Sequence, residues 1–123
     1  MAQPGNSLNG VRILVVEDNF LPAEVVRDML ESSGCAVVGP VGRIADALRL
    51  AESEALDAAI LDINLNGERC FPIACALRQR GVPFVFLTGY DDESIIPIEL
   101  RPTRRLGKPV FGPQLMAVLA EVI

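Results

Sequence analysis

Acidic, hydroxyl and ammonium side chains follow several apolar runs of this sequence. Glu17 and Asp18 come directly after ILVV, and Asp62 comes directly after AAIL. Thr88 ends the run VPFVFLT, and Lys108 follows the weak run RRLG. If these runs are parallel strands, their carboxyl ends meet at one edge of a sheet, where open α/β sheets bind ligands. The sequence therefore predicts one site that combines three carboxylates, a hydroxyl and an ammonium.

The three carboxylates indicate a divalent cation. Carboxylates gathered at one edge repel one another unless a cation lies among them. The chain has no histidine, and its three cysteines form no CxxC pair, so a zinc site is not expected. Oxygen ligands alone favour Mg²⁺ or Mn²⁺. Since Mg²⁺ commonly shares its shell with a phosphate, we expect phosphoryl chemistry, with Asp62, alone at the end of a central run, as the acceptor.

Lys108 and Thr88 are suited to hold a phosphoryl group. Lys108 is the single lysine in a chain with ten arginines. A compact ammonium can pair with a carboxylate and then with a phosphoryl oxygen in a tight site. The Thr88 hydroxyl can donate to a phosphoryl oxygen, and Gly89 leaves the approach open. The alternative is that the lysine is incidental and the threonine is structural.

Composition excludes several classes of protein. The chain has 123 residues and a formal net charge of -5, which suits one domain and argues against general binding to nucleic acid. Its apolar runs are too short to span a bilayer, and residues 1–10 lack the pattern of a secretion signal. Without histidine it can hold no Ser-His or Cys-His catalytic pair and cannot be a phosphohistidine carrier. We expect a cytoplasmic protein with free, buried thiols at Cys35, Cys70 and Cys75.

Apolar runs alternate five times with helical stripes along the chain. Continuous apolar runs are typical of a parallel sheet covered on both faces. We therefore predict a single α/β domain over residues 11–123, a doubly wound five-stranded parallel sheet with five helices, after a disordered lead-in over residues 1–10. The stretch NLNG is predicted to be a loop. Pro97 and Pro102 predict that the fourth helix is short or frayed.

The motifs VVEDN, ILDINLNG, FLTGY and GKP, in this order, resemble the receiver domain of two-component response regulators. The resemblance covers the chain from about Val11 to Ile123 and implies a flavodoxin-like fold with strand order 2-1-3-4-5. PFVFLTGY also looks like a stand-alone alphaproteobacterial subgroup with a Phe-Ala-Thr-Gly-aromatic string, with Leu87 in place of the alanine. The implied roles are a phosphoacceptor at Asp62, Mg²⁺ ligands at Glu17, Asp18, Asp62 and the Asn64 backbone carbonyl, and phosphoryl-binding groups at Thr88, Gly89 and Lys108.

One position departs from the family pattern. Receivers usually carry Tyr or Phe three residues before the lysine, where this chain has Arg105. Tyr90, the single tyrosine, is therefore the candidate for relaying the signal. We expect a downstream protein partner to bind through residues 90–119. The isoleucines at 95, 96 and 98 and Leu100 then either form that docking surface or simply cover the sheet.

Together these features predict a single-domain response regulator. It would accept a phosphoryl group on Asp62 from a sensor histidine kinase or a phosphotransfer protein, and would signal by protein binding or act as a phosphate sink. We expect no classical enzyme activity beyond assistance to its own phosphorylation and dephosphorylation, and no nucleic acid or membrane partner. One alternative is an aspartate-nucleophile phosphohydrolase, which usually needs a second aspartate where this chain has Asn64. Others are a receiver fragment of a larger regulator and a pseudo-receiver that only binds partners.

Overall fold

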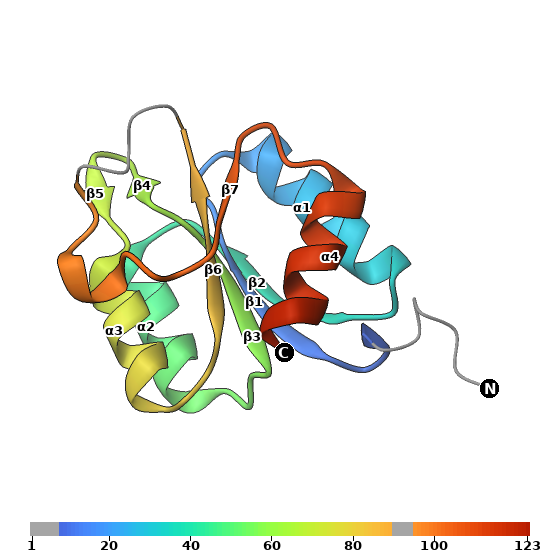
Figure 1. Cartoon of the computed structure of the whole chain (residues 1–123), viewed down its shortest axis with the longest axis horizontal. Coiled ribbons are helices and arrows are strands. Elements are labelled where there is room, and N and C mark those ends of the chain that lie inside the picture. The colour runs from blue at the N-terminus through green and yellow to red at the C-terminus, as the bar shows by residue number, and fades with distance from the viewer. Residues whose placement is uncertain (1–7, 90–94) are drawn as a thin grey trace.

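The computed structural model describes residues 8–89 and 95–123 and has three layers. A five-stranded parallel sheet lies between two pairs of helices, α2 and α3 on one face and α1 and α4 on the other (Figure 1). The sheet order is β2-β1-β3-β6-β7, which confirms the predicted order because β4 and β5 form a separate hairpin. The strands are β1 (Arg12–Val16), β2 (Ala36–Val41), β3 (Ala58–Asp62), β6 (Phe84–Thr88) and β7 (Arg105–Gly107).

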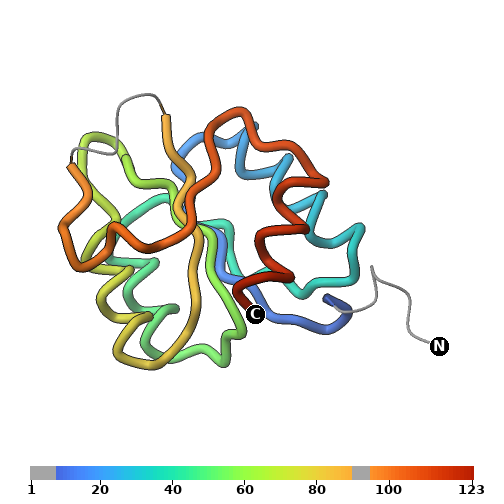
Figure 2. The backbone as a smooth tube through the Cα atoms, in the orientation of Figure 1, coloured from blue at the N-terminus to red at the C-terminus, as the bar shows by residue number. Residues whose placement is uncertain are grey.

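The central strands are apolar because helices cover them on both faces. Every residue of β3 is buried, since β3 pairs with β1 on one side and β6 on the other. The segments that follow β1, β3 and β7 gather at the same edge of the sheet, where β6 also ends (Figure 2). The predicted acids, Thr88 and Lys108 stand at this edge, as expected for an open parallel sheet.

Four α-helices present apolar stripes to the sheet. Ala47 and Ala51 of α2 face the core on one side, and Val26 and Leu30 of α1 face it on the other. Gly34 follows α1 with a φ of +88°, the left-handed conformation that commonly ends a helix. The helices are α1 (Phe20–Ser32), α2 (Ile44–Ser53), α3 (Phe71–Gln79) and α4 (Gly112–Val122).

The prediction of five helices is wrong: the described residues contain four α-helices. In place of the expected fourth helix is one 3₁₀ turn, η3 (Ile98–Leu100), because Pro97 and Pro102 interrupt any longer run. Leu100 is buried, whereas Ile98 is 74% exposed. Ile96, immediately before Pro97, is also buried. The apolar residues of this segment are therefore divided between the core and the surface.

The predicted loop NLNG is instead the start of a short antiparallel hairpin. Strands β4 (Asn64–Leu65) and β5 (Glu68–Arg69) pair across Asn66 and Gly67. Both turn residues have positive φ, 51° and 87°, which is typical of the Asn-Gly hairpin turn. The sequence carried the turn signal, but strands of two residues are too short to show an alternating pattern.

The N-terminal segment and the burial of the thiols were also predicted from the sequence. Most of the predicted lead-in lies outside the described residues, but Leu8 is described and is buried against the α1 and α4 side of the core. Its carbonyl lies 3.5 Å from the Cys35 thiol. None of the three cysteines, all in the described part of the chain, forms a disulfide. Cys35 and Cys70 are buried as predicted, whereas Cys75 is exposed, so its predicted burial is wrong.

Candidate functional site

Three carboxylates converge at the carboxyl ends of the two central strands. Glu17 and Asp18 follow β1, and Asp62 is the last residue of β3. The parallel register pairs Val16 with Leu61, which places the next residues of both strands side by side. One oxygen from each of the three acids lies within 4.8 Å of the others. Glu17 and Asp62 are each only 3% exposed, so the cluster is charged and largely desolvated.

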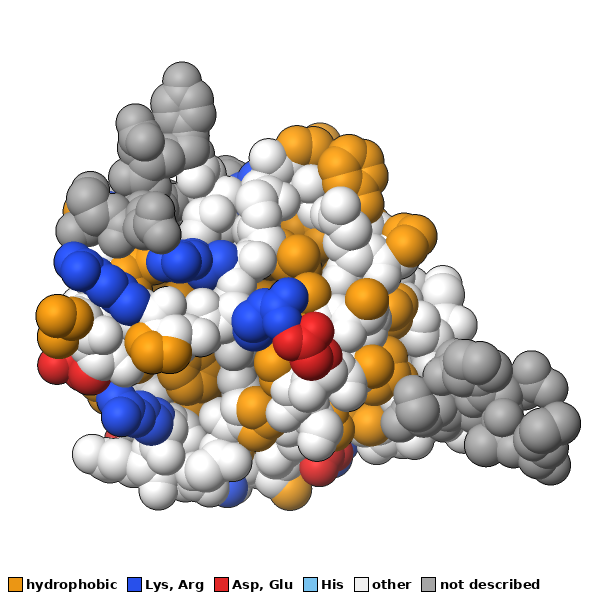
Figure 3. Space-filling view, in the orientation of Figure 1, with side chains coloured by type: hydrophobic (Ala, Val, Ile, Leu, Met, Phe, Trp, Pro, Cys, Tyr) orange, Lys and Arg blue, Asp and Glu red, His pale blue; other side chains and the backbone are white. Residues whose placement is uncertain are grey.

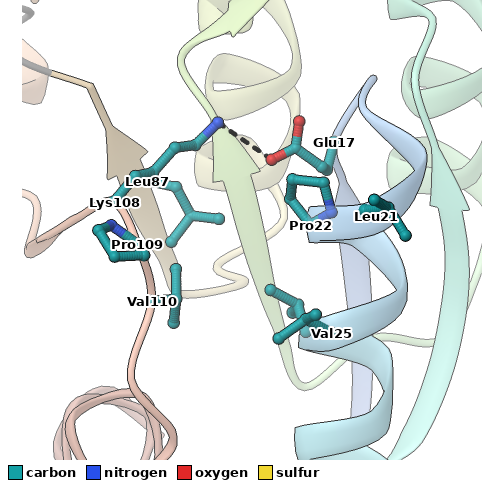
Figure 4. A pocket seen from close by; sticks show the side chains of 9 residues that line it. Glu17, Leu21, Pro22, Val25, Leu87, Lys108, Pro109 and Val110 are labelled. Atoms are coloured by element: carbon teal, nitrogen blue, oxygen red, sulfur yellow. Dashed lines mark ion pairs between the residues drawn. The ribbon is translucent and has the colours of Figure 1, made fainter.

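Lys108 brings a positive charge to this cluster from the other side. Its Nζ donates a hydrogen bond to Asp62 Oδ2 at 2.6 Å and lies 3.0 Å from Glu17 Oε1 (Figure 4). The Lys108 backbone N–H donates to the Thr88 carbonyl at 2.9 Å, which ties the start of this loop to the end of β6. One ammonium therefore faces two buried carboxylates, so their negative charge is only partly neutralised.

Each of the three acids also accepts a backbone hydrogen bond. A backbone N–H is a fixed donor, so it holds a carboxylate in one orientation more firmly than a mobile side chain does. The contacts are Asn19 N–H to Glu17 Oε2 (3.1 Å), Asn66 N–H to Asp18 Oδ2 (2.9 Å) and Asn64 N–H to Asp62 Oδ1 (3.2 Å). The acids are thus held by the turns that follow their own strands and by the tip of the β4–β5 hairpin.

Burial and mutual repulsion change the protonation of this site. Burial raises the pKa of Glu17 to about 7; the hydrogen bond and charge of Asp62 act in the same direction, and the Asn19 N–H and Lys108 oppose them. Burial by itself lowers the pKa of Lys108, but Asp62 and Glu17 outweigh it and the pKa is raised. The lysine therefore stays charged at neutral pH, while Glu17 can exchange a proton there.

The residues present fit a divalent cation. Glu17 Oε1 is buried and makes no hydrogen bond within the described part of the chain, although Lys108 Nζ lies at ion-pair distance. This contact, 3.0 Å between Lys108 Nζ and Glu17 Oε1, is an ion pair without hydrogen-bond geometry. A buried carboxylate oxygen without a hydrogen-bond donor, beside two other carboxylates, is a suitable ligand for Mg²⁺.

Of the other predicted site residues, Thr88, Gly89 and Asn64 lie at the same edge. Thr88 is the half-buried last residue of β6, next to β3, and Gly89 follows it and is exposed. The Asn64 side-chain oxygen accepts a hydrogen bond from Arg69 across the hairpin at 3.1 Å. Arg105 opens β7 and is paired with Phe86, away from the edge. Tyr90 lies outside the described residues.

The sequence did not reveal an apolar groove of about 530 Å³ beside the acids. It runs between α1 and the loop after β7, with Glu17 and Lys108 at one end (Figure 4). Leu21 and Val25 of α1 line the groove and are 72% and 48% exposed. The available signal in the sequence was that apolar residues early in α1, such as Leu21, lie outside the stripe that the helix buries. The remaining lining residues are Pro22, Val26, Leu87, Pro109 and Val110.

Exposed side chains are unevenly distributed around the site. Hydrophobic side chains gather over the part of the surface where α1 and α4 lie, and several Lys and Arg side chains lie on the side of η3 (Figure 3). Phe20 and Phe111, at the starts of α1 and α4, are 74% and 59% exposed. Among the described residues, no helix is both long enough and apolar enough to cross a membrane.

Comparison with known proteins gives the same family by sequence and by structure. Residues 13–119 match the model of the response regulator receiver domain. The solution structure of SdrG from Sphingomonas melonis is 40% identical, with a TM-score of 0.81 over 92% of this chain and 96% of that chain. The receiver domain of the sensor histidine kinase PA1611 from Pseudomonas aeruginosa, solved with magnesium in its active-site cleft, is 28% identical. Its TM-score is 0.81 over 92% of this chain and 97% of that chain.

Curated relatives match over a shorter stretch. The sensor protein TorS from Escherichia coli is 37% identical over 84 residues, which is 68% of this chain but 9% of TorS. The curated relatives are longer proteins, of which this chain spans between 9% and 38%. The family model nevertheless covers most of the chain, and the acids and lysine stand where the fold places a site. The chain therefore belongs to the response regulator receiver domain family.

Proposed function

We propose that this protein is a single-domain, cytoplasmic response regulator that accepts a phosphoryl group on Asp62 in a reaction that needs Mg²⁺ or Mn²⁺. The observation that carries the proposal is the convergence of three carboxylates within 4.8 Å, with the ammonium of Lys108 2.6 Å from Asp62. The donor would be a sensor histidine kinase or a phosphotransfer protein. The product would signal by binding another protein or serve as a phosphate sink.

Asp62 is the acceptor in this proposal because its carboxylate is already oriented. The Asn64 N–H holds Oδ1 and Lys108 holds Oδ2, so little reorganisation precedes attack. One carboxylate oxygen forms a bond to phosphorus while the bond from phosphorus to the donor nitrogen breaks, and the donor keeps that electron pair. Lys108 then moves its hydrogen bond to a phosphoryl oxygen, where the Thr88 hydroxyl and the exposed Gly89 backbone complete the binding of the group.

The divalent cation would be held by Glu17, Asp18, Asp62 and the Asn64 backbone carbonyl. Its chemistry there is to neutralise the negative charge shared by the acids and the incoming phosphoryl oxygens. Glu17 contributes a buried oxygen without a hydrogen-bond donor in the described chain, which supports this role. An oxygen-only ligand set suits both Mg²⁺ and Mn²⁺.

The phosphohydrolase alternative is not supported. Such an enzyme needs an acid two residues after its nucleophile to protonate a leaving group. That position is Asn64, whose side-chain oxygen is hydrogen-bonded to Arg69 and whose amide has no acidic proton to give. We therefore expect the chain to assist its own phosphorylation and dephosphorylation only as a receiver does, without turning over external substrates.

The groove beside the acids is the surface we propose for the phosphodonor. A protein that delivers a phosphoryl group must approach Asp62 closely, and the groove shares Glu17 and Lys108 with the site. Exposed apolar side chains such as Leu21 and Val25 bury favourably against a partner helix. The sensor kinase or phosphotransfer protein would therefore cover α1 and the loop after β7.

The output surface is proposed over residues 90–119, a range that includes η3 and also the loop after β7 that lines the groove. Arg105 stands where an aromatic switch is usual, so we propose that Thr88 moves toward the phosphoryl group and draws residues 89 and 90 with it. Tyr90 would relay that movement toward η3. Ile98 is exposed and available to a partner, whereas Leu100 is buried and is not.

Phosphorylation of the purified protein tests the proposal. With Mg²⁺ and a small acyl phosphate, we expect the intact mass to rise by one phosphoryl group, and Asp62→Asn to abolish the rise. Asp28→Asn, the same change at an exposed carboxylate on α1, is the matched control and should label like the parent. Equal labelling of Asp62→Asn and the parent would remove Asp62 from the proposal.

A further inference from the structure

Gly42, between β2 and α2, lies in backbone contact with Asp18. A Cβ at position 42 would stand 2.8 Å from the Asp18 Cα and 3.3 Å from the Glu17 carbonyl oxygen. A distance below 3.0 Å forces a shift, and the obstacle here is backbone rather than the end of a flexible side chain. Gly42 is therefore needed for its close approach to the residue that follows the first acid, and its φ is not in the left-handed region.

An irregularity in the sheet brings this loop against the acids. The pairing of β1 with β2 shifts register between Leu14 and Val16, opposite Gly39, which has a φ of +96°. After the shift, the Glu17 N–H donates to the Val41 carbonyl at 2.9 Å. Such bulges bend a strand and redirect the residues beyond it. Gly42 therefore directly follows Val41, whose carbonyl accepts a hydrogen bond from the backbone of Glu17.

The β4–β5 hairpin holds Asp18 through a second backbone group. The Asn66 N–H donates to Asp18 Oδ2 at 2.9 Å, and Asn66 has a φ of 51°, which few non-glycine residues adopt. Asp18, Gly42 and Asn66 all line a cavity of about 370 Å³, and Arg43 lines it as well. The Asp18 side chain therefore has both space and a competing cation nearby if it is not held.

We propose that Gly42 and Asn66 form a backbone clamp that positions Asp18 for the divalent cation. Gly42 fixes the Asp18 backbone and Asn66 fixes the direction of its carboxylate. Both are positioning residues, and neither touches the cation. This inference rests on the proposed function, because it assumes that Asp18 is a metal ligand.

The Gly42 contact is tested by titrating the protein with Mg²⁺ and monitoring the NMR shifts of its backbone amides. Gly42→Ala should weaken Mg²⁺ binding about tenfold, as for other residues that orient metal ligands. Gly107→Ala is the matched control, because a Cβ there meets nothing within 4 Å although the residue precedes Lys108. It should bind Mg²⁺ like the parent. Urea unfolding of the metal-free variants separates this effect from a general loss of stability.

A pair of substitutions at Asn66 tests the hairpin contact independently. Asn66→Ala disfavours the positive φ and should displace the N–H donor, weakening Mg²⁺ binding. Asn66→Gly keeps both the donor and the positive φ, so Mg²⁺ binding should remain at the parent level. This pair also tests the clamp if Gly42→Ala does not fold.

The outcomes separate the clamp from the proposed function. If the parent binds Mg²⁺ and both Gly42→Ala and Asn66→Ala bind it equally well, the clamp is wrong while the proposed function stands. Equal losses in Gly42→Ala and Gly107→Ala, or in Asn66→Ala and Asn66→Gly, would likewise overturn it. A parent that binds no Mg²⁺ would overturn the proposed metal site, and the clamp with it.

Discussion

The ends of β1 and β3 contribute to the site differently from the ends of β6 and β7. On the first side, the carboxylates are held by three backbone N–H groups, and Glu17 and Asp62 are nearly inaccessible to solvent. On the second side, β7 has only three residues, and Lys108 reaches the acids along a side chain that is 28% exposed. The backbone thus fixes the position of the negative charge, while a long side chain supplies the positive charge and can follow a phosphoryl group.

The segments that follow these strands are also held differently. The acids of β1 and β3 are followed directly by turns that return hydrogen bonds to them. Between β6 and β7, the chain instead forms η3, which is attached to the core mainly by the buried Ile96 and Leu100. The Arg101 side chain adds a hydrogen bond to the Ile96 carbonyl at 3.1 Å. Side-chain packing therefore anchors η3 to the core.

The largest expected effect is a loss of stability when this packing is removed. Leu100→Ala should lower the free energy of unfolding by about 2–5 kcal/mol, because Leu100 is 2% exposed and its removal leaves a cavity. Ile98→Ala, two residues earlier and 74% exposed, should change it by less than about 0.5 kcal/mol. Urea unfolding measures both. Similar losses in the two variants would mean that the segment is not anchored through Leu100.

The next effect concerns the charge supplied by β7. Lys108→Arg should slow phosphorylation of Asp62 by roughly 10²-fold, the size of effect seen when one donor to a developing charge is lost. A planar guanidinium does not replace one nitrogen that lies 2.6 Å from Asp62 and 3.0 Å from Glu17. The rate of mass increase with a small acyl phosphate is the measurement.

The reverse exchange is the control for this prediction. Arg104→Lys alters the exposed ion pair with Glu121 and should leave the rate unchanged. A normal rate in Lys108→Arg would show that any cation at this position suffices, and that the lone lysine is incidental.

A smaller effect is expected from pH, on the side of the acids. A proton on Glu17 and a divalent cation compete for the same carboxylate, and the pKa of Glu17 is raised to about 7 by burial and by Asp62. Apparent Mg²⁺ affinity should therefore rise by roughly tenfold between pH 6 and pH 8, since each proton displaced weakens binding on the acidic side. Titrations at the two pH values measure the change.

The raised pKa of Glu17 also determines how the stability of the metal-free protein changes with pH. Because the folded protein keeps the Glu17 proton to a higher pH than the unfolded chain, metal-free stability should fall as pH rises from 4.5 toward 7. Glu17→Gln should flatten both dependences. A parent whose Mg²⁺ affinity is equal at pH 6 and pH 8 would contradict a raised Glu17 pKa in the site.

Much of the fold could be predicted because it follows from local sequence patterns. The apolar run before Glu17 forms most of β1, Arg12–Val16. The alternation of apolar runs with helical stripes was likewise visible, since periodicity acts over a few residues. The fourth helix was overestimated because the prolines interrupt it and leave the 3₁₀ turn Ile98–Leu100 in the described part of the segment. The hairpin at Asn64–Arg69 was missed because its strands have two residues each.

The sequence by itself determined which chemical groups stand at the ends of the strands: the acids, the threonine and the single lysine. Alternation of apolar runs and helical stripes was enough to place them on one edge, because parallel strands share a direction. Only the tertiary structure decided that Gly42 touches Asp18, that the Asn66 N–H reaches its carboxylate, and that a groove borders Lys108. These contacts join residues far apart in the chain, and their distances depend on the paths of loops, which no local pattern encodes.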